Sequence, residues 1–388
     1  MFAHDLYVDL VQTQSPCSRE GYCLRVASGL LEDVSSALYL STFTREQLNA
    51  MELELHTLFI QLKLMLKQQF QDAEWLDDSS RSYLTSKLQQ LTAVTDGGRV
   101  FLGDSYMLNQ RLSDVDMNSS NSYLQNAVQL VRRYRSGMYS LYGAEPNLTD
   151  TIWPHLLLPY DTQAVAVYQL NTVVIPFGLI GFPQSTPDLP AYIFKARFGN
   201  DLARLIAHHF DAIGIEYGSS GKDMDLLSDI TKHKYSTIHE CDEMAYSFEK
   251  SWTNHKREVF TYQVDTSQSM NERFADRSAL QLSYKTYKRN AASEPLLPWL
   301  DMNHDKLYHM LVAQEFCTKG GMLDYTIQLF ESEQMPPFLR VTNMAQNSEA
   351  FSEAYSCGRG TQMNPEFKCN SFPDLKDVEG YSSDLSPH

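Results

Sequence analysis

The segment Arg204–Asp211, RLIAHHFD, has the residue types in this chain that are most suggestive of metal chemistry. It lies in a run with helical spacing of apolar residues that ends at a glycine. Two ligands one turn apart on one helix face can hold a zinc ion. However, Arg204 stands one turn before His208, and Leu205 stands one turn before His209. The two histidines lie about 100° apart around the helix, so they cannot share one ion. The segment is therefore a zinc site, an incomplete zinc site or a helix that merely contains histidines.

A second candidate is the sequence HECDE, in which His239 and Glu243 are four residues apart and Glu240 stands beside the histidine. This spacing places an imidazole and a carboxylate on one helix face, but the local sequence offers no third ligand. We therefore expect solvated residues on a surface helix, with a metal site as the alternative.

The elements that would position these residues are mainly helices. Apolar periodicity predicts two helices within residues 26–70, with Ser35 as a local cap and with Thr44 and Gln47 as a capping box. The aspartate pair 77–78 is a further helix start. Later helices are predicted at 121–143, 196–213, 236–254, 268–290 and 304–318.

The chain changes character after the turn-rich stretch GAEPNLTDTIWP, residues 143–154. Beyond it, alternating β-branched residues at 163–180 predict a strand. The tail is acidic and rich in turn formers, so we expect it to be mobile. The sequence predicts a mainly α protein with a small β-sheet, divided into residues 1–145, residues 146–370 and a tail at 371–388.

Bulk properties exclude some functions. The 388 residues carry a net charge of −16, which argues against nucleic acid as a partner because phosphate binding needs basic patches. No run of 18 apolar residues predicts a membrane span, and the N-terminus does not read as a signal peptide or an anchor. Asn118 and Asn147 begin acceptor patterns for N-glycosylation. Six cysteines without CxxC spacing favour disulfides over a thiolate-bound metal.

A strand, a histidine-bearing helix and a glutamate-bearing helix, in this order, are the layout of gluzincin metallopeptidases. The blocks NTVVIPFGLI, HHFDAIG, NERFADRSAL, LPWLDMNHDKLYHMLVAQEFC and QNSEAFSEAYSCGRGTQMNPEFKC occur in order across residues 165–369. Together they resemble the C-terminal half of neprilysin-family zinc endopeptidases. The resemblance implies a gluzincin, thermolysin-like metallopeptidase domain, and residues 1–145 would be part of a preceding helical lobe.

In that family the first zinc helix carries H-E-x-x-H, in which the glutamate activates the zinc-bound water. Matching HHFDAIG to the family places this motif on residues 204–208. Arg204 then replaces the first ligand, Leu205 replaces the general base, and only the second ligand, His208, remains. Leucine cannot accept a proton from water under any tuning of its surroundings.

The resemblance also assigns positions outside this helix. Glu272 matches the third zinc ligand, Asp276 matches the aspartate of the same block, and Asp211 matches the carboxylate that supports the ligand histidine. Gln334 replaces the histidine that stabilises the transition state. Arg340 matches the arginine that binds substrate.

The substrate-binding edge strand of the family, N-A-x-Y, reads Val165-Ala166-Val167-Tyr168, so Ala166 and Tyr168 are retained and the asparagine is lost. Because a ligand, the base and the transition-state histidine are all replaced, we predict no catalytic residue and no bound zinc. We hypothesise that Arg204 pairs with Glu272 instead. The alternative is that Arg204 turns to solvent and Glu272 is hydrated.

The family resemblance implies a disulfide between Cys241 and Cys369. It places the partners of Cys23, Cys317 and Cys357 in a family half that this sequence does not contain, so we expect a fragment or a truncated product. A local bridge between Cys17 and Cys23 is a further option, as is a Cys317–Cys357 bridge.

We predict a catalytically inactive neprilysin-like protein, extracellular or at the cell surface by resemblance, that binds peptides or protein partners, including related peptidases. The first alternative is an active zinc endopeptidase with atypical metal ligation that cleaves small extracellular peptides. The second is a purely structural interaction module. Zinc as a cofactor belongs to the first alternative only.

Overall fold

The computed structural model describes residues 19–95, 108–110, 112–113, 115, 120–140, 142, 157–180, 190–222, 226–246, 248–253, 259–264, 267–289, 295–320, 322–331 and 334–372. Cys17, Asn118, Asn147 and the tail from residue 373 lie outside these residues, so what was expected of them stays a prediction. No helix among the described residues is both long and apolar enough to cross a membrane.

The chain forms two compact units whose segments interleave along the sequence. The first contains residues 1–52, 94–163 and 174–182, and the second contains residues 53–93, 164–173 and 183–388. The predicted boundary near residue 146 falls in the stretch 143–156, which is not described.

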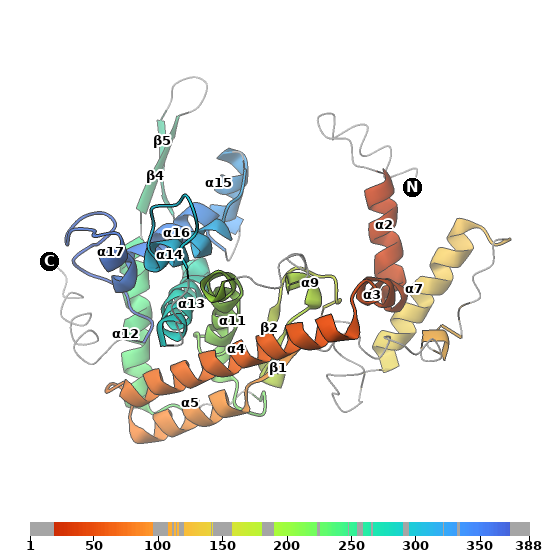
Figure 1. Cartoon of the computed structure of the whole chain (residues 1–388), viewed down its shortest axis with the longest axis horizontal. Coiled ribbons are helices and arrows are strands. Elements are labelled where there is room, and N and C mark those ends of the chain that lie inside the picture. Colours follow the sequence, from red (N-terminus) through yellow and green to blue (C-terminus); the bar gives the residue numbers. More distant parts are fainter. Residues whose placement is uncertain are drawn as a thin grey trace. The chain divides into compact units, whose positions relative to one another are not determined.

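The first unit is helical (Figure 1). Its buried cluster consists of Leu40, Phe43, Leu48 and Phe177. Its helices are α2 (Arg19–Leu30), α3 (Glu32–Leu40), the start of α4 (Arg45–Asp72), α7 (Tyr123–Ser140) and α9 (Phe177–Ile180).

Two of the three predicted helix starts are confirmed. The Thr44 backbone N–H donates to Gln47 Oε1 at 2.8 Å, and the Gln47 backbone N–H donates to Thr44 Oγ1 at 3.2 Å, which is the capping box that opens α4. Asp77 caps the helix that follows. Ser35 lies inside α3, which begins directly after Leu31, so the prediction of a cap there is wrong.

The second unit holds most of the helices and the residues predicted for the site. Its helices are the rest of α4, α5 (Asp78–Gln90), α10 (Ala191–Phe194), the π-helical turn η4 (Lys195–Gly199), α11 (Asn200–His208), α12 (Asp229–Tyr246), α13 (Met270–Arg289), α14 (His304–Gln314), α15 (Met322–Glu331), α16 (Pro337–Gln346) and α17 (Glu349–Ala354). Short 3-10 turns are η3 (Tyr168–Leu170), η5 (Gly214–Glu216) and η6 (Ser267–Ser269).

The small sheet has three short strands, β1 (Thr92–Val94), β2 (Val165–Val167) and β3 (Thr172–Val174), in the order β1-β3-β2. A single strand at 163–180 was expected, and that prediction is wrong in extent. The turn η3 and Asn171, whose φ is 45°, separate β2 from β3. Asparagine tolerates this left-handed conformation better than most residues. Because β3 lies between β1 and β2, β2 lies at an edge of the sheet.

The predicted helix at 236–254 is also wrong in extent. Helix α12 ends at Tyr246, and β4 (Phe248–Thr253) pairs antiparallel with β5 (Val259–Val264). The sequences FEKSWT and VFTYQV are rich in aromatic and β-branched residues, which favour strands over a helix. The predictions for α13 and α14 are confirmed to within a few residues.

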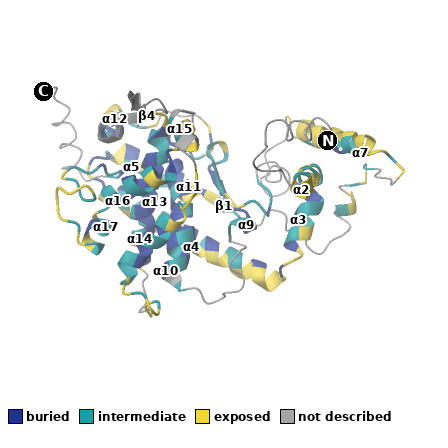
Figure 2. Ribbon diagram, turned by 90° about the horizontal axis from the view of Figure 1, so that it is seen from above, coloured by how far each residue is buried: buried dark blue, intermediate teal, exposed yellow. Residues whose placement is uncertain are grey.

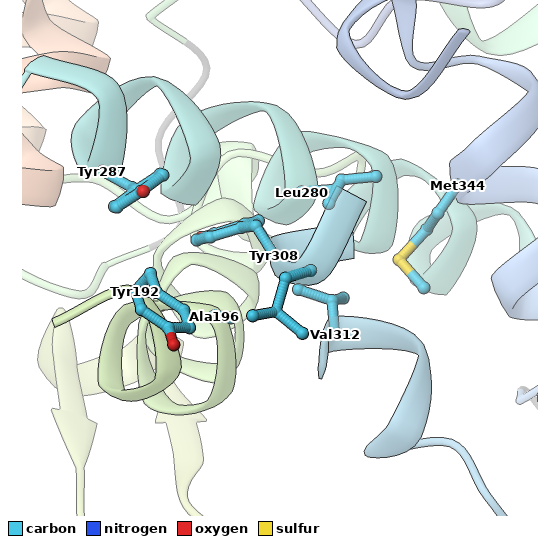
Figure 3. Packing of buried hydrophobic residues seen from close by; sticks show 8 residues of the cluster. Tyr192, Ala196, Leu280, Tyr287, Tyr308, Val312 and Met344 are labelled. Carbon is cyan, nitrogen blue, oxygen red and sulfur yellow. The ribbon is translucent and has the colours of Figure 1, made fainter. Parts of the chain in front are cut away.

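One buried cluster of the second unit is mainly aromatic and includes residues of α13 (Figure 3). The rings of Tyr287 and Tyr308 stack at 5.0 Å, and Tyr284 meets Tyr308 edge-on at 5.3 Å. The buried members of the cluster are Tyr192, Ala196, Leu280, Tyr287, Leu307, Tyr308, Val312 and Met344. This packing fixes α13 against α10, α14 and α16.

Helix α5 is held to the segment after α11 by a fully buried lysine. Lys87 Nζ donates to the Gly214 carbonyl and lies 5.4 Å from the centre of the Phe210 ring. Burial lowers the pKa of Lys87 from 10.5 to about 7, against the opposing effect of the Asp211 charge. The unfolded chain therefore binds more protons than the folded chain between these two pKa values.

We predict that the free energy of unfolding rises with pH across this window, by up to about 1.4 kcal/mol per pH unit from Lys87. Chemical denaturation at several pH values between about 7.5 and 9.5 measures the slope. Lys87→Met should remove this contribution. The surface variant Lys232→Met should keep it, and equal slopes for wild type and Lys87→Met would contradict the prediction.

Candidate functional site

The candidate site lies between α11 and α13, which pack together along their length. Alanines at four-residue spacing are fully buried on both helices, Ala203 and Ala207 on α11 and Ala275 and Ala279 on α13. Small side chains let two helix backbones approach closely. This close packing brings the polar residues beside the alanines within reach of each other.

An ion pair joins the two helices. Arg204 Nη1 lies 3.1 Å from Glu272 Oε2 and 3.5 Å from His208 Nε2. The side chains of Arg204 and Glu272 are 22% and 16% exposed. The hypothesised pairing of Arg204 with Glu272 is therefore present, and the alternative of a solvated Arg204 is not.

His208 lies between two carboxylates. Its Nδ1 lies 2.8 Å from Asp211 Oδ2, and its Nε2 lies 3.5 Å from Glu272 Oε1. The other Asp211 oxygen accepts the backbone N–H groups of Ile213 and Gly214 at 3.0 and 2.7 Å. Asp211 thus orients the imidazole and also fixes the turn between α11 and η5 by accepting its backbone N–H groups.

Arg340 is buried and firmly bound. Its Nε and Nη2 each donate to Asp276 at 2.7 Å, which is a bidentate pair, and its Nη2 lies 3.5 Å from Glu272. Its Nη1 donates to Gln334 at 3.4 Å. Burial alone would lower the pKa of Arg340, but the Asp276 charge and hydrogen bonds raise it above the ordinary value. Gln334 acts here as an acceptor for an arginine.

The four charged groups at the centre of the site compensate each other. Arg204 and Arg340 supply two positive charges, and Glu272 and Asp276 supply two negative charges. A divalent cation would add two further positive charges beside two guanidinium groups that cannot lose theirs.

These residues do not fit a catalytic zinc, which needs three protein ligands and an open position. His208 Nε2 and Glu272 Oε1 converge, but the third group beside them is the guanidinium of Arg204. A guanidinium has donors only and cannot bind a metal. No group of three metal-binding side chains occurs among the described residues.

His209 points into the core. It is fully buried, and its ring meets Tyr168 edge-on at 5.5 Å. Burial, with the nearby Lys87 charge, lowers the pKa of His209 to about 3, so the ring is neutral. Tyr168 directly follows β2, and its ring also stacks on Tyr217 at 5.8 Å. These ring contacts hold the C-terminal end of β2 in place. Ala166, in the middle of β2, is half-buried.

Of the second candidate pair only His239 can be placed, because the side chain of Glu243 lies outside what the structure describes. His239 is buried and stacks on Phe274 at 5.3 Å, because α12 packs against α13. The prediction of a solvated histidine there is wrong. The neighbouring Cys241 forms the predicted disulfide with Cys369, with Cα atoms 5.8 Å apart.

The remaining described cysteines are free thiols. Cys23 and Cys317 are exposed, and Cys357 is half-buried. The suggested bridge between Cys317 and Cys357 is therefore not formed. Cys17, the suggested local partner of Cys23, lies outside the described residues, so that bridge stays a prediction.

Sequence reasoning missed a carboxylate beside the site. Asp201 stands one turn before Arg204 on α11, and burial raises its pKa although Arg204, Arg340 and Arg197 act in the opposite direction. Residues three positions apart are neighbours on a helix, so the sequence could have indicated that Asp201 lies close to Arg204. Phe316, whose side chain lies 4.8 Å from the Arg340 guanidinium, had no such signal.

The model of peptidase family M13 matches residues 165–371. Human endothelin-converting enzyme-like 1 is 24% identical, over 95% of this chain and 45% of its own length. Rabbit (Oryctolagus cuniculus) neprilysin is 21% identical, over 89% of this chain and 45% of its own length. The chain thus spans less than half the length of these relatives.

Solved structures share the fold. A zinc metalloprotease of Mycobacterium tuberculosis in complex with an inhibitor superposes with a TM-score of 0.75 at 18% identity, over 94% of this chain and 53% of that one. The Haemonchus galactose-containing glycoprotein complex gives a TM-score of 0.69 at 18% identity, over 90% of this chain and 55% of that one. At this level of identity the likeness concerns the fold.

We predict that the Arg204–Glu272 pair stabilises the second unit. Arg204→Met and Glu272→Gln should each lower the free energy of unfolding by about 1–3 kcal/mol, since each removes a charge-assisted hydrogen bond between partly buried groups. The double variant should lose less than the sum, with a coupling of about 1–2 kcal/mol measured by urea denaturation. Arg197→Met is the matched control, because its pair with Glu315 is more exposed and should contribute less than about 1 kcal/mol. Additive effects of the two single variants would contradict this prediction.

Proposed function

The chain belongs to peptidase family M13, and we propose that it is a member of this family that binds peptides or proteins without hydrolysing them. The observation that carries the proposal is the contact of Arg204 with Glu272 and His208 at the point where a metal would need a third ligand.

The remaining chemistry of the site supports this proposal. Hydrolysis of a peptide needs an activated water, a general base and a group that stabilises the oxyanion. Leu205 is buried and apolar, so it cannot act as a base. Gln334 is already engaged by Arg340 and carries no proton that it can transfer. Leu205 and Gln334 therefore supply neither a base nor a proton donor to the group at Glu272.

Peptide binding is supported by the edge strand β2. It lies at the end of the order β1-β3-β2, and an edge strand can pair with an extended peptide through backbone hydrogen bonds. Tyr168 fixes the end of β2 against His209 and Tyr217. We propose an extended peptide segment as the ligand, held by backbone pairing and not by a metal.

An oxidising location is part of the proposal. The Cys241–Cys369 disulfide closes a loop of 128 residues, and such bridges persist outside the cytosol. We therefore propose that the protein is extracellular or at the cell surface.

The decisive experiment measures zinc content and peptide hydrolysis on the purified chain. We expect no stoichiometric zinc by mass spectrometry and no chelator-sensitive cleavage of a mixed peptide library. Arg204→His should create a third ligand and raise zinc affinity by at least about tenfold. Leu205→Glu is the control, because it adds a charged residue to the same helix but no ligand at position 204. It should therefore not raise the zinc affinity.

Stoichiometric zinc in the wild-type protein, with hydrolysis that a chelator abolishes, would overturn the proposal. Hydrolysis without zinc would overturn it as well. If Arg204→His and Leu205→Glu gain zinc equally, the assignment of Arg204 to the ligand position is wrong.

A further inference from the structure

Helix α7 of the first unit carries an exposed apolar stripe, which consists of Leu124, Val128, Val131 and Met138. These side chains are 68%, 39%, 44% and 43% exposed. Their spacing of four, three and seven residues places them on one helix face. Figure 2 shows α7 mainly in the colour of exposed residues. Leu130, the one described α7 residue that is buried, lies on another side of the helix.

The stripe has the pattern of a helix-pairing seam. Residues at alternating spacings of four and three form the core of two-stranded coiled coils. Arg135 lies on the same helix face, four residues after Val131 and three before Met138. A single polar residue within such a seam fixes the register in which a partner helix can pair. At 18 residues the helix is about 27 Å long, enough for a partner helix of similar length.

The charge on α7 restricts the partner. Residues Tyr123–Ser140 contain three arginines and no acidic residue, in a chain whose net charge is −16. Arg133 pairs with Asp33 at 2.6 Å within the first unit. Arg132 and Arg135 are exposed on or beside the stripe, and Arg135 lies over the Tyr139 ring at 5.9 Å.

We propose that the α7 stripe is a docking surface for an acidic amphipathic helix of a partner protein. The partner's apolar residues cover the stripe, and its carboxylates face Arg132 and Arg135. A second copy of this chain is a poorer occupant. Pairing two α7 helices brings two arginine-bearing rows together, and two molecules of charge −16 repel each other. This inference is independent of the proposed function of the site between α11 and α13.

The test uses two synthetic peptides of about three heptads, with leucine in the seam and either glutamate or lysine at the flanking positions. Fluorescence anisotropy with the full chain should show binding of the glutamate peptide at least about tenfold tighter than that of the lysine peptide. Val131→Asp should weaken this binding by at least about tenfold. Ser136→Asp introduces the same charge on an exposed position of the polar face, so it should leave binding nearly unchanged.

Charge reversal completes the test. The double variant Arg132→Glu with Arg135→Glu should prefer the lysine peptide, and circular dichroism should show all variants folded. The proposal is overturned if neither peptide binds, if Val131→Asp and Ser136→Asp weaken binding equally, or if charge reversal leaves the preference unchanged. It is also overturned if light scattering finds a dimer that Val131→Asp dissociates, because the occupant is then a second copy.

Discussion

The contact between Arg204 and Glu272 is the interaction on which the rest of the site depends. Close packing of α11 against α13 leaves the Glu272 carboxylate with little water, so it needs a positive partner. A guanidinium meets that need through hydrogen bonds and a permanent charge. It differs from a metal ion in one decisive respect, because it cannot act as a Lewis acid on a bound water. The guanidinium can therefore hold the two helices together without supplying the chemistry of a metal ion.

The neighbouring residues are consistent with this exchange. Asp276 binds Arg340 through two short hydrogen bonds, and Glu272 lies between the two arginines. The His208–Asp211 contact remains because Asp211 also accepts the backbone N–H groups after α11. Asp211 and Asp276 thus have structural roles in this fold that do not depend on a metal.

The sequence predicted the site better than it predicted the local folds around it. Arg204, His208 and Glu272 could be assigned because several long sequence blocks occur in the family's order. Such a match depends on residue identities along the chain and needs no knowledge of tertiary packing. The capping box at Thr44 was predictable because both partners lie within one turn. His239 was not, since its burial depends on Phe274, which is 35 residues later in the chain. The interruption of the predicted strand was not predictable either. It occurs at Asn171, which adopts a left-handed conformation, and the alternation of apolar residues does not indicate such a conformation.

Burial and chemistry impose separate constraints on a helix such as α11. The alanines and leucines that face α13 must fit the space available, because interiors are close-packed and tolerate few changes of volume. Arg204 is half-buried at the margin of that contact, where a longer side chain can reach a carboxylate without displacing the core. A ligand at the margin can thus be replaced by a guanidinium at small cost to the fold, whereas Ala203 beside it cannot be enlarged. Substitutions at the margin of the α11–α13 contact can therefore change the chemistry of the site while the packing of the two helices stays the same.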